Sequence, residues 1–166
     1  MKKISLILMI IWMGFIFYNS SRSGTASNLV SYKVTNTIRT EKSAIVNDGN
    51  SNHKIQYSRL PKTKKDEKIN IFVRKNAHAF EYFVLALIVS GCVFYFLNLK
   101  GKKAVVYIAF ICLLYAVTDE FHQSFVPGRQ SLISDVLIDF IGSIIGMIIF
   151  YSVYYNIFNL RKIKRN

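Results

Sequence analysis

Apolar stretches with little or no charge recur four times along the chain, at residues 4–21, 79–99, 104–118 and 136–160. A helix needs about 20 mainly apolar residues to cross the hydrocarbon core of a bilayer. Backbone groups in lipid must be paired within the spanning structure, and no alternating pattern of the β-barrel type is present. The pattern therefore predicts an all-α fold, an integral membrane bundle of four transmembrane helices. The predicted helices are about 4–21, about 73–98, about 104–121 and about 134–160.

The first apolar stretch admits a second interpretation. Lys2 and Lys3 precede it, as basic residues precede the apolar core of a secretory signal peptide. The residues after it, Asn19-Ser20-Ser21-Arg22, form a poor cleavage site. We therefore expect this stretch to remain as the first helix of a single membrane domain over residues 1–166.

A long polar loop, residues 22–70, separates the first two predicted helices. Its apolar residues Val30, Val34, Ile38 and Ile45 recur near helical spacing. This spacing indicates an amphipathic interfacial helix at 28–46, although a solvated linker accounts for most of the loop equally well. The loop ends in a basic stretch before the second apolar segment.

Composition narrows the function classes. Hydrophobic residues make up 52% of the chain, charged residues 19%, and the net charge is +13 with two cysteines. These values exclude a disordered tail, a collagen-like fibre and a disulfide framework. The basic residues flank apolar segments and match no nucleic-acid-binding motif, so the charge reflects membrane topology rather than nucleic acid. The partner that composition predicts is the lipid bilayer.

Charge density also predicts the orientation in a cell membrane. With four spans, both termini and the turn between helices two and three lie on one side. That side carries nine positive charges and no acid, at Lys2, Lys3, Lys100, Lys102, Lys103, Arg161, Lys162, Lys164 and Arg165. The other thirteen basic residues lie on the opposite side, spread over a longer stretch of chain. The number of positive charges on each side therefore does not decide the orientation, but their density in short segments favours cytoplasmic termini.

Polar and charged residues gather where helix two begins, helix three ends and helix four begins. Arg74, His78 and Glu81 share one helical face, and Asp135 and Asp139 share another. Charged groups within a span are costly unless they face the bundle and are paired, which predicts a polar pocket at one rim. Candidates for chemistry in this pocket are His78, Glu81, Asp119, Glu120 and His122. Candidates for holding a substrate are Arg74, Lys75, Gln123, Arg129, Asp135 and Asp139.

The residue types leave four interpretations open. The pocket could be a structural ion-pair network, or a proton path, although acids at one rim alone make a poor path. It could hold a metal, with His78, Glu81, Glu120 and His122 as ligands, in no standard zinc spacing. It could also perform acid–base chemistry, with a histidine oriented by a carboxylate and Arg129 binding a phosphate. The residues name no cofactor.

Three blocks of sequence resemble the VanZ-like family. FVRKNAHAFEY at 72–82 is similar to its R-K-x-A-H-x-x-E-Y signature, and DEFHQSFVPGR at 119–129 is similar to its D-E-x-H-Q-x-F-x-P-G-R block. DVLID at 135–139, with Gly142 and Gly146, resembles the block that follows, and Ser20-Ser21 stands where the family carries a serine pair. The multi-residue match is highly specific and spans about half the chain.

The resemblance implies a small bacterial integral membrane protein. The family's named member gives low-level resistance to the glycopeptide teicoplanin, which implies a role in antibiotic resistance or in cell-envelope maintenance. Abundant Ile, Lys and Asn residues suit a low-GC Gram-positive host. An anionic lipid or a cell-wall precursor is then the expected partner. The alternative is an enzyme that acts on an envelope lipid or a lipid-linked phosphate head group.

Overall fold

The computed structural model describes residues 2–24, 27–34, 37, 64–129 and 131–163. The long helices are α1 (Lys2–Ser20), α3 (Lys64–Tyr95), α4 (Gly101–Gln123) and α5 (Ile133–Ile163). A short helical segment, residues 27–34, stands between α1 and α3, and no strand occurs in the described part of the chain. The predicted all-α class is therefore confirmed for these residues.

Three of these helices are long and apolar enough to cross a membrane, over Glu67–Tyr95, Gly101–Gln123 and Ile133–Ile157. The apolar part of α1, Ile4–Ser20, is shorter. These spans begin or end within a few residues of the predicted ones, with one difference. The helix predicted from 73 starts at Lys64, because the Lys and Glu residues before the apolar stretch favour helix without contributing any hydropathy signal.

The predicted loop 22–70 is thereby shorter than the sequence suggests, since residues 64–70 belong to α3. Of the predicted amphipathic helix 28–46, the described residues up to 34 are helical, and 35, 36 and 38–46 lie outside the described residues. After α3 the chain reverses through Asn98 and Gly101, which both have positive φ (54° and 61°). A left-handed residue at such a point ends a helix.

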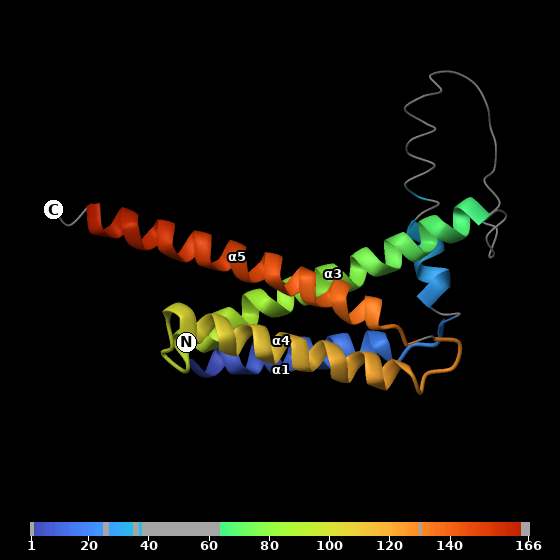
Figure 1. Ribbon diagram of the computed structural model, residues 1–166, viewed down its shortest axis with the longest axis horizontal. Coiled ribbons are helices and arrows are strands. Elements are labelled where there is room, and N and C mark those ends of the chain that lie inside the picture. Colours follow the sequence, from blue (N-terminus) through green and yellow to red (C-terminus); the bar gives the residue numbers. More distant parts are fainter. Residues whose placement is uncertain (1, 25–26, 35–36, 38–63, 130, 164–166) are drawn as a thin grey trace, which may run out of the picture.

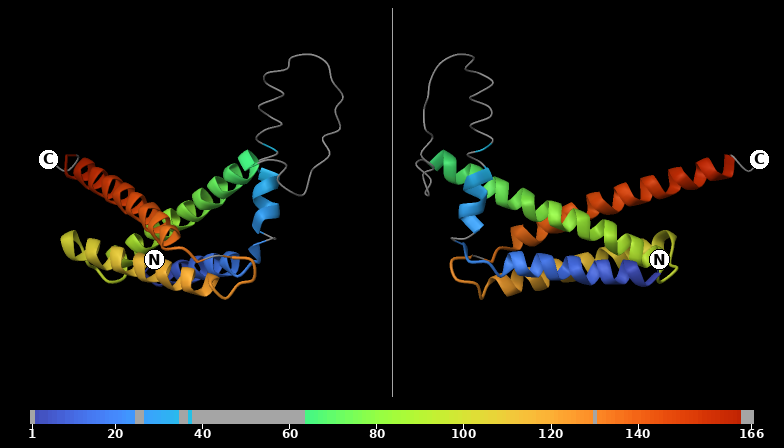
Figure 2. Two further views of the ribbon diagram at one scale, coloured as in Figure 1. Left: turned by 45° about the vertical axis from the view of Figure 1, so that its right-hand side comes forward. Right: turned by 180° about the vertical axis from the view of Figure 1, so that it is seen from behind.

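The helices form a bundle in which α3 is central, because it packs against α1, α4 and α5. Figure 1 shows α3 and α5 crossing each other, with both chain ends at the same end of the bundle. The start of α5 and the ends of α1 and α4 lie towards the opposite end in every view (Figures 1 and 2). The ends of α1 and α4 and the start of α5 therefore lie towards one end of the bundle.

Two glycines of α5 set how closely it approaches α3. A Cβ atom added to Gly142 would lie 2.2 Å from the carbonyl oxygen of Ala79, and one added to Gly146 would lie 2.4 Å from that of Phe83. These distances are shorter than any real contact, so the two backbones touch directly. Small residues at this spacing permit such an approach between membrane helices.

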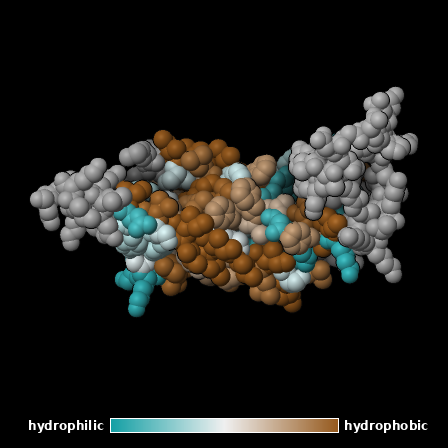
Figure 3. Space-filling model, turned by 90° about the horizontal axis from the view of Figure 1, so that it is seen from above, coloured by the Kyte–Doolittle hydropathy of each residue, from teal (hydrophilic) through white to brown (hydrophobic). Residues whose placement is uncertain are grey.

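The outer surface of the bundle is apolar. Large side chains such as Ile11, Phe110 and Ile148 are exposed on different helices. Figure 3 shows hydrophobic residues over the middle of the molecule and hydrophilic ones mostly towards its two ends. A continuous apolar belt of this kind is unsuited to water, and it is the surface of a membrane protein.

We predict that Gly142→Ala lowers the free energy of unfolding by about 1–3 kcal/mol, the usual cost of forcing a methyl group into a closed contact. Gly91→Ala is the matched control, because a Cβ atom there meets nothing within 4 Å. Thermal unfolding of both variants in detergent checks this. Equal midpoints for the two variants would show that the α3–α5 contact is looser than described.

Candidate functional site

The polar rim is assembled from three helices and one turn. Arg74, Lys75, His78 and Glu81 come from α3, while Asp119, Glu120 and Gln123 come from α4. Asp135 and Asp139 come from the first turns of α5, and Arg129 comes from the turn between α4 and α5. The structure therefore brings residues separated by more than 60 positions to one end of the bundle.

Two cavities lie at this rim. The larger, of about 260 Å³, is lined by Lys75, Glu120, Gln123, Asp135 and Asp139 together with apolar Ile71, Leu132 and Ile138. The smaller, of about 190 Å³, lies against the helical segment 27–34 and is lined by Asn19 and Glu81. Both are also lined by Arg74, His78 and Arg129. These three side chains therefore form the wall between the two cavities.

Arg129 is held by neutral acceptors. Its Nη1 donates to Gln123 Oε1 at 2.8 Å, and its Nε and Nη2 donate to the backbone carbonyls of Arg22 and Asn19, each at 3.2 Å. Nη1 also lies 3.4 Å from His78 Nε2. Burial lowers the pKa of Arg129, and the neighbouring Arg74 lowers it further. A guanidinium nevertheless stays protonated, so Arg129 is a cation with carboxylates nearby, Asp119, Glu120 and Glu81, but with none of them in direct contact among the described residues.

The turn that carries Arg129 is fixed by a second backbone contact. Gly24 N donates to the carbonyl of Pro127 at 3.2 Å, and a Cβ atom at Gly24 would lie 2.0 Å from the carbonyl oxygen of Gly128. Gly128 has a φ of 74°, a left-handed conformation that glycine adopts without strain. The two glycines let the segment after α1 lie directly on this turn.

Arg74 is also bound to an uncharged group. Its Nη1 donates to Asn28 Oδ1 at 3.0 Å, and Asn70 Nδ2 donates to the same oxygen at 3.1 Å. The buried Nε of Arg74 has no hydrogen-bond partner among the described residues. Within the part of the chain that the structure describes, neither Arg74 nor Arg129 has a carboxylate at ion-pair distance.

The carboxylates at the rim have separate partners. Asp119 Oδ2 accepts from Ser20 Oγ at 2.8 Å and from Gln123 Nε2 at 3.0 Å. Glu120 Oε1 accepts from the backbone N–H of Leu132 at 2.7 Å and so orders the start of α5. Lys75 Nζ lies 2.6 Å from Asp135 Oδ1. Among the described residues of the rim, this is the only ion pair between a lysine or arginine and an acid. An ion-pair network of the kind that the sequence allowed is therefore limited to one such pair here.

Glu81 lies between two polar groups. Its Oε1 accepts from Asn19 Nδ2 at 2.7 Å, and its Oε2 lies 3.5 Å from His78 Nδ1. The histidine and the carboxylate therefore face each other, but no hydrogen bond joins these two atoms. Their helical spacing, three residues apart on one face of α3, places them side by side.

His122 stands apart from the other candidates. Its ring stacks on Phe17 with centroids 4.3 Å apart, and its Nε2 lies 3.1 Å from Ser21 Oγ. It lines neither cavity. Successive residues of a helix point about 100° apart, so Asp119, Glu120 and His122 of α4 cannot all face one point. The sequence proposed both Glu120 and His122 as metal ligands, but the group that the structure brings together is His78, Asp119 and Asp139.

The sequence analysis missed the polar residues that support the charged ones. Asn19 and Ser20 at the end of α1 hold Glu81 and Asp119, and Asn28 holds Arg74. A signal was present for Ser20 alone, because it belongs to the serine pair of the VanZ-like pattern. The role of Asn28 depends on how the segment 27–34 packs against α3, which no local pattern reports.

We predict that the two serines of that pair differ in their effect on stability. Ser20 is fully buried, so Ser20→Ala leaves a buried carboxylate short of a donor and costs about 1–3 kcal/mol of unfolding free energy. Ser21, just after α1, is exposed, and its hydroxyl contacts the carbonyl of Phe17 and Nε2 of His122, which water can replace. Ser21→Ala therefore changes stability by less than about 0.5 kcal/mol. Thermal unfolding in detergent measures both. A larger loss in Ser21→Ala would contradict the assigned hydrogen bonds.

The chain was also compared with known proteins. No curated protein and no solved structure matches it. The model of one protein family, described as VanZ/LLP1, matches residues 5–158. That match includes every rim residue described above and nearly the whole chain, and it agrees with the motif blocks at 72–82 and 119–129. The chain belongs to the VanZ-like family.

Proposed function

We propose that this VanZ-like protein holds an anionic head group of an envelope lipid, or of a lipid-linked cell-wall precursor, in the polar pocket at the outer membrane face. Through this binding it contributes to glycopeptide resistance of the teicoplanin type or to envelope maintenance. One observation supports the proposal above the others. Arg74 and Arg129 stand together in the wall between two cavities, and among the described residues their hydrogen-bond partners are uncharged groups.

Two half-buried cations side by side are costly, because each loses part of its hydration and repels the other. Hydrogen bonds to amide and carbonyl oxygens satisfy their donors in part but supply no negative charge. An anion between them would supply that charge, and the planar fork of a guanidinium matches the oxygens of a phosphate. Phosphate is the anion common to envelope lipids and lipid-linked precursors.

The lining of the larger cavity suits a ligand that is part lipid. Ile71 and Leu132 are exposed apolar residues at the cavity, beside the charged Lys75 and Arg129. A head group in the cavity would leave its acyl chains against this apolar surface and the bilayer. An acyl-bearing glycopeptide also partitions near the bilayer surface, so ligand and drug would meet in the same region.

The outer placement of the pocket depends on topology. We infer that α1 is a fourth span, since its 19 residues measure about 28 Å, close to the hydrocarbon thickness of about 30 Å. Four spans place both termini on one side, and the dense positive charge there favours the cytoplasm. The rim, at the other end of the bundle, then faces outwards.

We predict that expression of the wild-type protein in a glycopeptide-sensitive Gram-positive host raises the inhibitory concentration of teicoplanin more than that of vancomycin. Arg129→Gln at matched membrane abundance loses this protection, because it removes the guanidinium fork. Lys33→Gln is the control: it removes one positive charge from an exposed side chain that lines neither cavity. Susceptibility assays on the four strains, including empty vector, measure the effect.

A direct binding measurement tests whether the ligand binds, independently of any resistance phenotype. Native mass spectrometry of the detergent-purified protein should show a co-purified anionic lipid in the wild type and in Lys33→Gln, and less of it in Arg129→Gln. Absence of protection from a well-expressed wild type would reject the resistance role. Equal lipid retention in all three proteins would reject the binding site itself.

A second candidate function is enzymatic. It is favoured by the His78–Glu81 pair, because His78 lines both cavities and its Nδ1 lies 3.5 Å from the carboxylate of Glu81. A histidine so oriented can transfer a proton to or from a bound head group. The substrate would be the envelope lipid or lipid-linked phosphate that Arg74 and Arg129 hold.

The enzymatic reading predicts a change in envelope lipids. Mass spectrometry of lipid extracts should show a species altered by the wild type and unaltered by Glu81→Gln at equal abundance. Glu67→Gln, an exposed carboxylate near the start of α3, serves as the matched control and should behave as the wild type. Identical lipid profiles for wild type and empty vector would remove the enzymatic function and leave binding alone.

A further inference from the structure

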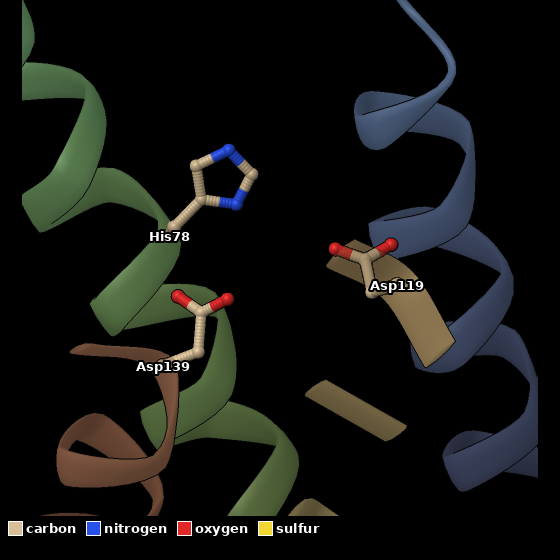
Figure 4. A group of neighbouring side chains, drawn as sticks. All are labelled: His78, Asp119 and Asp139. Carbon is tan, nitrogen blue, oxygen red and sulfur yellow. The ribbon is translucent and has the colours of Figure 1, made fainter. Parts of the chain in front are cut away.

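Three potential metal ligands converge at the bottom of the rim. His78 of α3, Asp119 of α4 and Asp139 of α5 each offer one ligand atom, and these atoms all lie within 4.8 Å of one another. Figure 4 shows the three side chains turned towards a common space from three separate elements. The three residues lie 41 and 20 positions apart in the sequence, so no local motif identifies them as a group.

The group contains buried atoms with no hydrogen-bond partner. Asp119 is 3% exposed, and its Oδ2 accepts the hydrogen bonds from Ser20 and Gln123. Its Oδ1 is buried and unpartnered among the described residues, as is Nδ1 of His78. Because Oδ2 faces Ser20 of α1, the other oxygen in Figure 4 is turned towards His78 and Asp139.

Charge balance points the same way. Asp139 is 2% exposed and Asp119 is 3% exposed, so two carboxylates stand close together away from water. The nearby cations are engaged elsewhere: Lys75 pairs with Asp135, and Arg129 donates to Gln123 and to carbonyls. No lysine or arginine lies at ion-pair distance from either carboxylate among the described residues. Two such neighbours repel each other when both are ionised, and a proton or a bound metal ion relieves that repulsion.

We propose that His78, Asp119 and Asp139 bind one divalent transition-metal cation, of the class of Zn²⁺ or Mn²⁺. One imidazole nitrogen and two carboxylate oxygens suit both ions. Ligand atoms about 2.0–2.2 Å from a tetrahedral zinc lie about 3.3–3.6 Å apart, so atoms that lie within 4.8 Å of one another here would draw together on binding, as side-chain rotation allows. Such a set of three leaves further positions for water or substrate.

Glu81 completes the surroundings of the site. Its Oε2 is buried and unpartnered, 3.5 Å from Nδ1 of His78. It is therefore placed to accept a hydrogen bond from a water on the ion. The other ring nitrogen of His78, Nε2, lies near Arg129. The metal site thus borders the arginine pair, but it depends on different residues from the anion site and stands or falls independently of it.

The test is metal uptake by the full-length protein, purified in detergent with a tag that contains no histidine and stripped with a chelator. Equilibrium dialysis against Zn²⁺ or Mn²⁺, followed by elemental analysis, should show one ion per chain for at least one of the two metals. Asp139→Asn and Asp119→Asn should each weaken binding at least tenfold, because each removes one ligand.

Two controls define specificity. Glu67→Gln removes an exposed carboxylate near the start of α3, and His122→Gln removes a histidine outside the cavities. Both should bind the ion as the wild type does. Gel filtration and thermal unfolding establish which variants are folded, and Co²⁺ bound to the wild type should show an absorption spectrum of nitrogen and oxygen ligands without thiolate bands.

Failure of the wild type to take up either ion would overturn the proposal, whatever the variants do. Full uptake by Asp139→Asn would also overturn it, since the ion would then lie elsewhere. Neither result affects the anion site, which is measured by lipid retention in Arg129→Gln. A bound metal without a bound lipid, or the reverse, therefore identifies which of the two proposals is wrong.

Discussion

The direct backbone contact between α3 and α5 is the constraint on which the rim depends. Gly142 meets the carbonyl of Ala79, and Gly146 meets that of Phe83. His78 immediately precedes Ala79, and Asp139 stands less than one turn before Gly142, so the contact brings this histidine and this acid together. A larger residue at either glycine would separate the helices and open the group. The close packing of α3 against α5 therefore also positions the side chains of the site.

The rest of the site depends on how a membrane protein satisfies buried charge. A carboxylate in a span needs donors, and α1 supplies them through Asn19 to Glu81 and Ser20 to Asp119. The segment after α1 then lies on the turn that carries Arg129, through the contact of Gly24 with Gly128. The first helix therefore orders the site without contributing a charged group to it. Its apolar residues contact the other helices and the surrounding surface, and the polar residues at its end hydrogen-bond to the acids of the rim.

The sequence was sufficient to predict the helices and the rim, because apolar length and charge position are local signals. Arg74, His78 and Glu81 share a face by spacing alone, and the structure places all three along one cavity. Neighbours on α4 could not be sorted in this way. Glu120 turns to the backbone of Leu132 and His122 stacks on Phe17, since the direction of each depends on which helix packs beside it. The contact of Arg74 with Asn28 is likewise tertiary.

The position of Gln123 is what the two proposed ligand sites require. Its Oε1 accepts from Arg129 at 2.8 Å, and its Nε2 donates to Asp119 at 3.0 Å. The amide therefore holds cation and carboxylate together without direct contact, and their attraction is weaker than in an ion pair. A network that only locked the helix ends would be expected to place the guanidinium on the carboxylate itself. With the amide between them, an anion could still reach the arginine and a cation could still reach the acid, as the proposed anion and metal sites demand.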